Sequence, residues 1–142
     1  MIRLLIIFLI TATTFAVATD IKTEKSFPKW HAIIKYNSED GFQLRDEAVQ
    51  FMGIKFLPLH GNPPWKIPES ALVRVKYSTG VYRKYQDWIS FVLVEVISSS
   101  ASESLVRSRD LEKGDQIAIT GGSELRLTER DLTNDAQDTC SH

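Results

Sequence analysis

The chain has 142 residues, of which 17 are basic and 18 are acidic, so its formal net charge is −1. Hydrophobic residues make up 43% and charged residues 25%, a composition typical of a folded domain and not of a disordered chain. The balanced charge excludes nucleic acid as an expected partner, because phosphate binding requires a basic patch. Cys140 is the only cysteine. No intramolecular disulfide can therefore form, and packing must supply the stability.

The N-terminal residues have the pattern of a secretory signal. Arg3 precedes an apolar run from Leu4 to Ala18, which ends in the small residues Ala16 and Ala18. A membrane anchor is the competing interpretation, but the run of about 15 residues is shorter than the ~20 that span a bilayer. We expect residues 1–18 to be removed. The remaining 124 residues carry 16 basic and 18 acidic side chains, a net charge of −2, and contain no membrane span. The expected location is periplasmic or secreted.

Most of the remaining chain has the pattern of short strands separated by turns. Residues 19–29 are polar and lysine-rich and are expected to form a flexible lead-in, and residues 133–142 are expected to form a disordered tail. Between them, 30–132 is expected to form a single β domain of six to eight short strands. The fold class predicted is a small antiparallel β-barrel or roll. The expected strands are 30–36, 54–59, 72–77, 81–85, 88–97, 105–107 and 116–120, with a turn at 78–80 between the third and fourth.

One short helix is predicted over residues 45–52. Leu44, Ala48 and either Phe51 or Met52 fall on one face at helical spacing. Gly53 is placed to end the helix in a left-handed conformation.

Within the most apolar strand, 88–97, alternation predicts that Phe91 and Leu93 face the core. Leu93→Ala would then cost ~2–5 kcal/mol of unfolding free energy.

No catalytic pattern is found. His31, His60 and His142 have no metal-ligand spacing among them. His31 is expected to be a partly buried structural residue and His60 to face solvent. The chain lacks the Gly-x-Ser-x-Gly pattern of a serine nucleophile. We therefore expect a non-enzymatic protein that needs no cofactor.

Two weaker sites are predicted. Cys140 and His142 offer a thiolate and an imidazole, which suit a soft metal such as copper, so a small periplasmic metal-binding protein is the alternative function. Trp65 follows two prolines, and we expect its ring to be exposed and to contact a partner protein.

Three segments, taken in order, resemble one family. They are 42–54, which contains the predicted helix and Gly53; Ile67-Pro68-Glu69-Ser70-Ala71-Leu72-Val73 with the following Gly80-Val81-Tyr82; and 111–125, which contains Lys113-Gly114-Asp115. Together they resemble the membrane-proximal domain of periplasmic adaptor subunits (membrane fusion proteins) of resistance–nodulation–division efflux pumps. The resemblance covers residues 42–130.

The chain departs from that family in two respects. Arg45 occupies the place where the family usually has a serine or threonine N-cap, which weakens the start of the predicted helix. Full adaptors carry a helical hairpin, a lipoyl-like domain and a β-barrel where this chain has only the twelve residues from Lys55 to Lys66. The resemblance therefore implies one adaptor domain exported alone, which acts as an accessory or binding module in transmembrane transport. Its expected partner is another envelope protein, such as an inner-membrane transporter; docking to an outer-membrane channel is not implied. The oligomeric state stays open.

Overall fold

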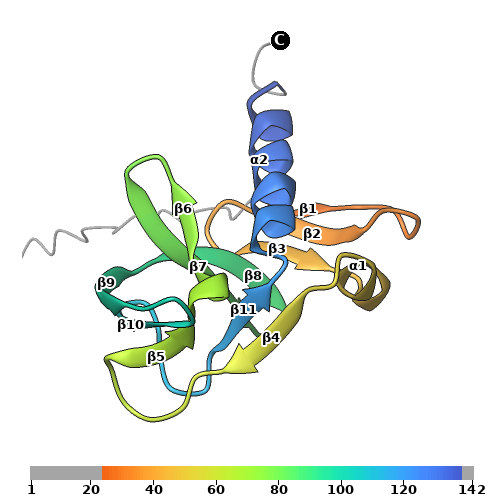
Figure 1. Ribbon diagram of the computed structural model, residues 1–142. Coiled ribbons are helices and arrows are strands. Elements are labelled where there is room, and N and C mark those ends of the chain that lie inside the picture. Colours follow the sequence, from red (N-terminus) through yellow and green to blue (C-terminus); the bar gives the residue numbers. More distant parts are fainter. Residues whose placement is uncertain (1–23, 139–142) are drawn as a thin grey trace, which may run out of the picture.

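The computed structural model describes residues 24–138. The expected signal (1–18), the first part of the expected lead-in (19–23) and the pair Cys140 and His142 lie outside the described residues. The described part is mainly β, with antiparallel sheets, as predicted (Figure 1).

Two sheets make up the fold. The larger has eight strands in the order β1-β2-β3-β8-β7-β11-β4, with β6 also paired to β7, and the smaller has three in the order β5-β10-β9. Among residues 24–138 no ladder joins the edge strands β1 and β4, so a closed barrel is not found. The strands are β1 (Lys25–Ser26), β2 (Ile33–Asn37), β3 (Gly41–Leu44), β4 (Lys55–Pro58), β5 (Trp65–Pro68), β6 (Val73–Val75), β7 (Ser78–Tyr85), β8 (Trp88–Leu93), β9 (Glu95–Ser99), β10 (Glu103–Arg107) and β11 (Gln116–Thr120).

The core lies on both faces of the central strands β7 and β8. Consecutive side chains of a strand point to opposite faces, and Val81 and Tyr82 of β7 accordingly enter two different hydrophobic clusters. The first cluster includes Tyr82, Phe42 and Leu125, and the second includes Val81, Trp65 and Val106. The second cluster joins the two sheets, because Trp65 and Val106 belong to the smaller one.

The predicted short helix is confirmed as α1 (Asp46–Phe51), and Gly53 has the expected left-handed conformation with φ +64°. Arg45 occupies the N-cap position without a side-chain capping bond. Val49 and Met52 of this segment pack against the first cluster, whereas Phe51 points away from it. A helix this short is not stable by itself, so the packing of Val49 and Met52 against the first cluster stabilises it.

A second helix, α2 (Gly122–Asp138), was not predicted. Residues 133–138 continue this helix, although the sequence indicated a disordered tail there. Leu125 and Leu132 are seven residues apart, hence on one face, and both are buried in the first cluster. Figure 1 shows α2 standing on the sheet next to β2 and β3. Packing of the face that carries Leu125 and Leu132 stabilises a helix that is otherwise mostly polar.

Several boundaries differ from those predicted. The described chain has eleven strands, more than the six to eight expected, and β1 lies inside the segment expected to be a flexible lead-in; its Lys25 and Ser26 pair with Tyr36 and Lys35. The turn between β6 and β7 is at Lys76-Tyr77, not at 78–80, and Gly80 lies within β7 opposite Leu93. A side chain at Gly80 would overlap Phe91 and Val92, so the glycine serves close strand packing.

The prediction for Leu93 is wrong: its side chain is 57% exposed. Ile89 and Phe91 contact the first cluster and Val92 contacts the second, but the first cluster ends before Leu93. We now expect Leu93→Ala to change the unfolding free energy by no more than ~0.5 kcal/mol. Urea unfolding of Leu93→Ala beside Val92→Ala, whose side chain is 6% exposed, measures this. A larger loss for Leu93→Ala than for Val92→Ala would contradict the assignment of faces.

Candidate functional site: an aromatic groove beside α1

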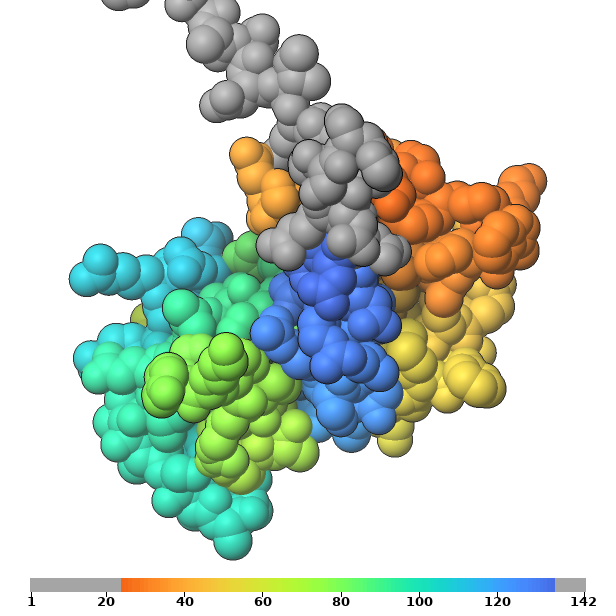
Figure 2. All heavy atoms as spheres, turned by 90° about the horizontal axis from the view of Figure 1, so that it is seen from above, coloured from red at the N-terminus to blue at the C-terminus, as the bar shows by residue number. Residues whose placement is uncertain are grey.

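Two adjoining hollows lie between residues 27–32, α1 and α2. One has a volume of about 600 Å³ and is bordered by Trp30, Ala48 and Phe51. The other, of about 270 Å³, is bordered by Phe27, Met52 and Leu132 among others. His31 and Ala32 border both. We call the combined surface the aromatic groove. Figure 2 shows the surrounding segments: the N-terminal strands (orange) and the segment that includes α1 (yellow) lie on one side of α2 (blue).

The groove exposes two large aromatic side chains. Trp30 is 83% exposed and Phe51 is 91% exposed. Phe51 is exposed because α1 turns Val49 and Met52 towards the sheet. Trp30 is exposed because it lies in the turn before β2 and not in the strand predicted for 30–36. Single exposed apolar residues are common. Aromatic residues are enriched in protein–protein interfaces, so two exposed rings at one hollow make this surface a candidate binding site.

His31 connects the two hollows. Its ring stacks on Phe27, with centroids 4.8 Å apart, and lies 5.8 Å from the Trp30 ring. The backbone N–H of Ile33 donates to His31 Nδ1 at 3.3 Å. The imidazole is therefore held in place between two aromatic neighbours, in agreement with the structural role predicted for it.

The groove is bordered by both signs of charge. Lys29, Arg45 and Glu47 all line the larger hollow. The Arg45 guanidinium donates to two backbone carbonyls, that of His31 at 2.7 Å and that of Pro28 at 3.2 Å. These bonds fasten the 28–31 segment to the start of α1, and they fix the wall of the groove that carries Trp30.

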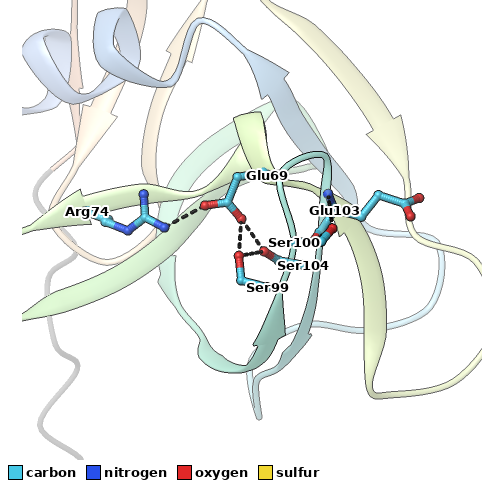
Figure 3. A network of polar contacts seen from close by, with 6 residues as sticks. All are labelled: Glu69, Arg74, Ser99, Ser100, Glu103 and Ser104. Atoms are coloured by element: carbon cyan, nitrogen blue, oxygen red, sulfur yellow. Dashed lines mark hydrogen bonds and ion pairs between the residues drawn. The ribbon is translucent and has the colours of Figure 1, made fainter.

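A second cluster of functional groups lies at the edge of the smaller sheet (Figure 3). Glu69 is the first residue of a 3₁₀ turn, Glu69–Ala71, and its carboxylate accepts hydrogen bonds from three side chains. Arg74 Nη2 donates at 2.6 Å, Ser99 Oγ donates at 2.8 Å, and Ser104 Oγ donates as well. These bonds connect the turn to β6, β9 and β10.

The electrostatics of this cluster do not suit acid–base catalysis. Hydrogen bonds from Ser104, Ser99 and Arg74 lower the pKa of Glu69 from 4.5 to about 2. A general base works best with a pKa near the operating pH, so a carboxylate with a pKa of about 2 is a poor proton acceptor. Ser104 is also buried, with 1% of its surface exposed. We therefore interpret the cluster as a structural clamp, in which the Glu69 carboxylate holds the 3₁₀ turn to β6, β9 and β10.

The lowered pKa predicts how stability depends on pH. The folded-state pKa of about 2 is below the unfolded value of 4.5, so the ionised clamp stabilises the fold fully above pH 4.5. This contribution is lost as the pH falls from 4.5 to 2. Glu69→Gln should therefore lower the melting temperature most above pH 4.5, and the difference from the unmodified protein should shrink towards pH 2.

Thermal melts from pH 7 to pH 2 measure this effect. Glu103→Gln is the control, because Glu103 makes an ion pair with Lys66 in which both side chains are largely exposed. Such pairs contribute little. A difference between Glu69→Gln and the unmodified protein that stays constant over the whole pH range would contradict the clamp.

The structure places the residues singled out in the sequence as follows. Trp65 is 3% exposed and packs in the second cluster, so the prediction that its ring is exposed, on which the expected partner contact depended, is wrong. Trp65 begins β5, and its ring packs in the second cluster with Val81 of the larger sheet and with Val106, which lies opposite it on β10. His60 is exposed, as predicted. Cys140 and His142 lie outside the described residues, and within residues 24–138 no group of three or more His, Cys, Asp or Glu side chains could hold a metal ion.

Trp30 and Phe51 were not among the binding residues predicted from the sequence. Trp30 was expected within a strand, and Phe51 was one of two residues expected to line the buried face of α1. Helical spacing does carry a signal for Phe51, because Val49 and Met52 are three apart and leave it on the other side of the short helix.

Comparison of the chain with protein-family models, curated proteins and solved structures found no match. Within residues 24–138, no helix combines the length and the apolar character that crossing a membrane requires.

Proposed function

We propose that this chain is a non-enzymatic, exported binding module that contacts another envelope protein through the aromatic groove. The observation that carries the proposal is the pair Trp30 and Phe51, 83% and 91% exposed at one hollow. Aromatic side chains account for a large share of the energy in protein interfaces. Their ordered surroundings, with Arg45 bonded to the 28–31 segment, reduce the entropy lost on binding.

The resemblance to an adaptor's membrane-proximal domain supplies the proposed partner, an inner-membrane transporter on the periplasmic side. The short connection between α1 and β5 supports this choice, because residues 55–66 form β4, a loop with Pro63 and Pro64, and the first two residues of β5. A helical hairpin that could reach an outer-membrane channel has no place there. An antiparallel β roll that is open between β1 and β4 is the architecture we propose for the module.

In-cell cross-linking tests the proposed function. The double variant Trp30→Ala/Phe51→Ala should reduce capture of an inner-membrane protein at least tenfold, because loss of one aromatic hot spot costs ~2 kcal/mol or more of binding energy. Its melting temperature should stay nearly unchanged, since both side chains are exposed. Trp65→Ala cannot serve this test, because Trp65 is buried.

Tyr77→Ala is the matched control. Tyr77 is fully exposed at the turn of the β6–β7 hairpin, which projects from the body of the molecule (Figure 1). Its loss should leave capture unchanged. Capture that survives Trp30→Ala/Phe51→Ala, or capture of an outer-membrane channel with no inner-membrane component, would overturn the proposal.

A further inference from the structure

We propose that a second groove, over the hairpin of β7 and β8, binds a neutral oligosaccharide. Two hollows of about 170 Å³ and about 520 Å³ adjoin there, because Glu39, Arg83 and Ser90 border both. We call the combined surface the polar groove. Among residues 24–138 it shares no bordering residue with the aromatic groove. The inference therefore does not depend on the proposed function.

One face of the β7–β8 hairpin forms the floor of the polar groove. Arg83 lies opposite Ser90, and Tyr85 lies opposite Trp88. All four side chains share one face, because residues two apart on a strand point the same way. The Tyr85 side chain is 55% exposed and that of Trp88 is half-buried, and both border the smaller hollow. The floor thus presents aromatic surface next to a guanidinium and a hydroxyl group.

The two loops that border this floor are held by hydrogen bonds. In the 37–41 turn, Asn37 Nδ2 donates to the Asp40 carboxylate at 3.0 Å. In the loop that follows β10, the backbone carbonyl of Asp110 accepts a hydrogen bond from Arg83 Nη1 at 2.7 Å. Groups that are already fixed lose less conformational entropy when a ligand binds.

Arg83 carries hydrogen-bond donors that the rest of the described chain does not use. A guanidinium has five N–H groups. Nη1 donates to the Asp110 carbonyl and lies 3.8 Å from the Asp115 carboxylate, whereas the buried Nε has no hydrogen-bond partner among residues 24–138. A buried donor without an acceptor costs free energy. Because 28% of the Arg83 side chain is exposed, it can turn its unused donors towards an oxygen-rich ligand in the hollows.

The chemistry of the borders favours hydroxyl groups over an ion as the ligand. The borders carry guanidinium donors and carboxylate acceptors together; these are Arg83 and Arg109, and Glu39, Asp40 and Glu112. An anion would be repelled by the carboxylates, and a cation would leave the guanidinium donors without an acceptor. A hydroxyl group both donates and accepts, so it can bond to either kind of side chain.

The aromatic floor narrows the ligand to a sugar. One face of a pyranose ring consists largely of C–H groups and is apolar, so it packs on an aromatic ring such as that of Tyr85 or Trp88. Ligand sites commonly have volumes of about 300–1,000 Å³. The smaller hollow alone is below this range, and together the two hollows have room for more than one sugar ring.

Titration followed by backbone amide NMR tests the proposal. The full 142-residue chain is expressed with whatever processing the cell applies. The probes are three neutral tetrasaccharides (cellotetraose, maltotetraose and chitotetraose), the anion tetragalacturonate and the cation spermine. At least one neutral probe should bind with a Kd of about 1 mM or lower. The largest shifts should fall on residues 83–90 and 109–112.

Three outcomes would overturn the proposal. They are the absence of binding by all three neutral probes, tighter binding of tetragalacturonate or spermine than of any neutral probe, and shifts centred on the aromatic groove at 27–32 and 46–52.

A pair of tyrosine variants tests the role of the aromatic floor. Tyr85→Ala should raise the Kd of the neutral probe about fivefold, because it removes one ring contact. Its melting temperature should change little, since Tyr85 is exposed. Tyr77→Ala is the matched control: Tyr77 is also exposed but lies at the turn between β6 and β7, so the Kd should not change. Equal Kd values for Tyr85→Ala and Tyr77→Ala would contradict a sugar bound on the floor.

Arg83→Lys tests the donors. Lysine keeps the positive charge but lacks the planar set of N–H groups. The Kd of the neutral probe should rise about fivefold or more. An unchanged Kd would contradict the role of Arg83. If the melting temperature shows that Arg83→Lys is unfolded, the comparison of Tyr85→Ala with Tyr77→Ala decides the proposal.

Discussion

Gly41→Ala should lower the unfolding free energy by about 3–5 kcal/mol, through backbone strain and steric overlap together. Gly41 begins β3 with φ +96°, a conformation that costs a residue with a Cβ ~1–2 kcal/mol. A Cβ at this position would also overlap the carbonyl oxygen of Ile89. That oxygen belongs to the backbone of β8, the strand on which Phe42 of β3 pairs with Ile89. The β8 backbone cannot move aside without weakening the pairing between β3 and β8.

Gly114→Ala is the matched control for this prediction. Gly114 has the same φ of +96°, but nothing lies within 4 Å of the position of an added Cβ. It should lose only the ~1–2 kcal/mol of conformational strain. Urea unfolding of both variants measures the difference, which reports the overlap with Ile89. Equal losses for Gly41→Ala and Gly114→Ala would show that β8 does not approach Gly41 as described.

Leu125→Ala should cost ~2–5 kcal/mol, the usual range for a buried leucine. Leu125 is 0% exposed and attaches α2 to the first cluster, to which Tyr82 and Ile54 also belong. The same helix is also bonded to the sheet, because the Tyr82 hydroxyl of β7 donates to Glu129 at 2.8 Å. Arg126, on the helix itself, donates to the same carboxylate at 2.7 Å. Burial, with the neighbouring Glu129 carboxylate, raises the pKa of Tyr82, so the hydroxyl keeps its proton.

Leu127→Ala, on the same helix, is the control. Leu127 is 51% exposed, and its loss should change the unfolding free energy by ~0.5 kcal/mol or less. Helix propensity changes equally in the two variants, so the difference between them in urea unfolding isolates packing against the sheet. Equal small losses would mean that α2 does not pack on the first cluster.

The local sequence determined those elements that end at residues with a specific turn or capping role. The turn at 37–41 forms because Asn37 accepts hydrogen bonds from the backbone N–H groups of Glu39 and Asp40. The helix α1 ends where Gly53 adopts a left-handed conformation, and β11 matches the strand predicted at 116–120. These features depend on residues a few positions apart, so the sequence is sufficient to predict them.

Tertiary structure alone decided which side chains are exposed. Trp65 and Trp30 both flank prolines or turns in the sequence, yet Trp65 is buried in the second cluster and Trp30 is exposed. Alternation along β8 could not predict the exposure of Leu93, because a hydrophobic cluster packs on each face of β7 and β8. The two clusters end at different residues of the strand. The helix α2 is stabilised by two buried leucines, which pack against strands that are distant in the sequence. Burial depends on which remote segments lie against a residue, and neighbouring residues in the chain do not specify that.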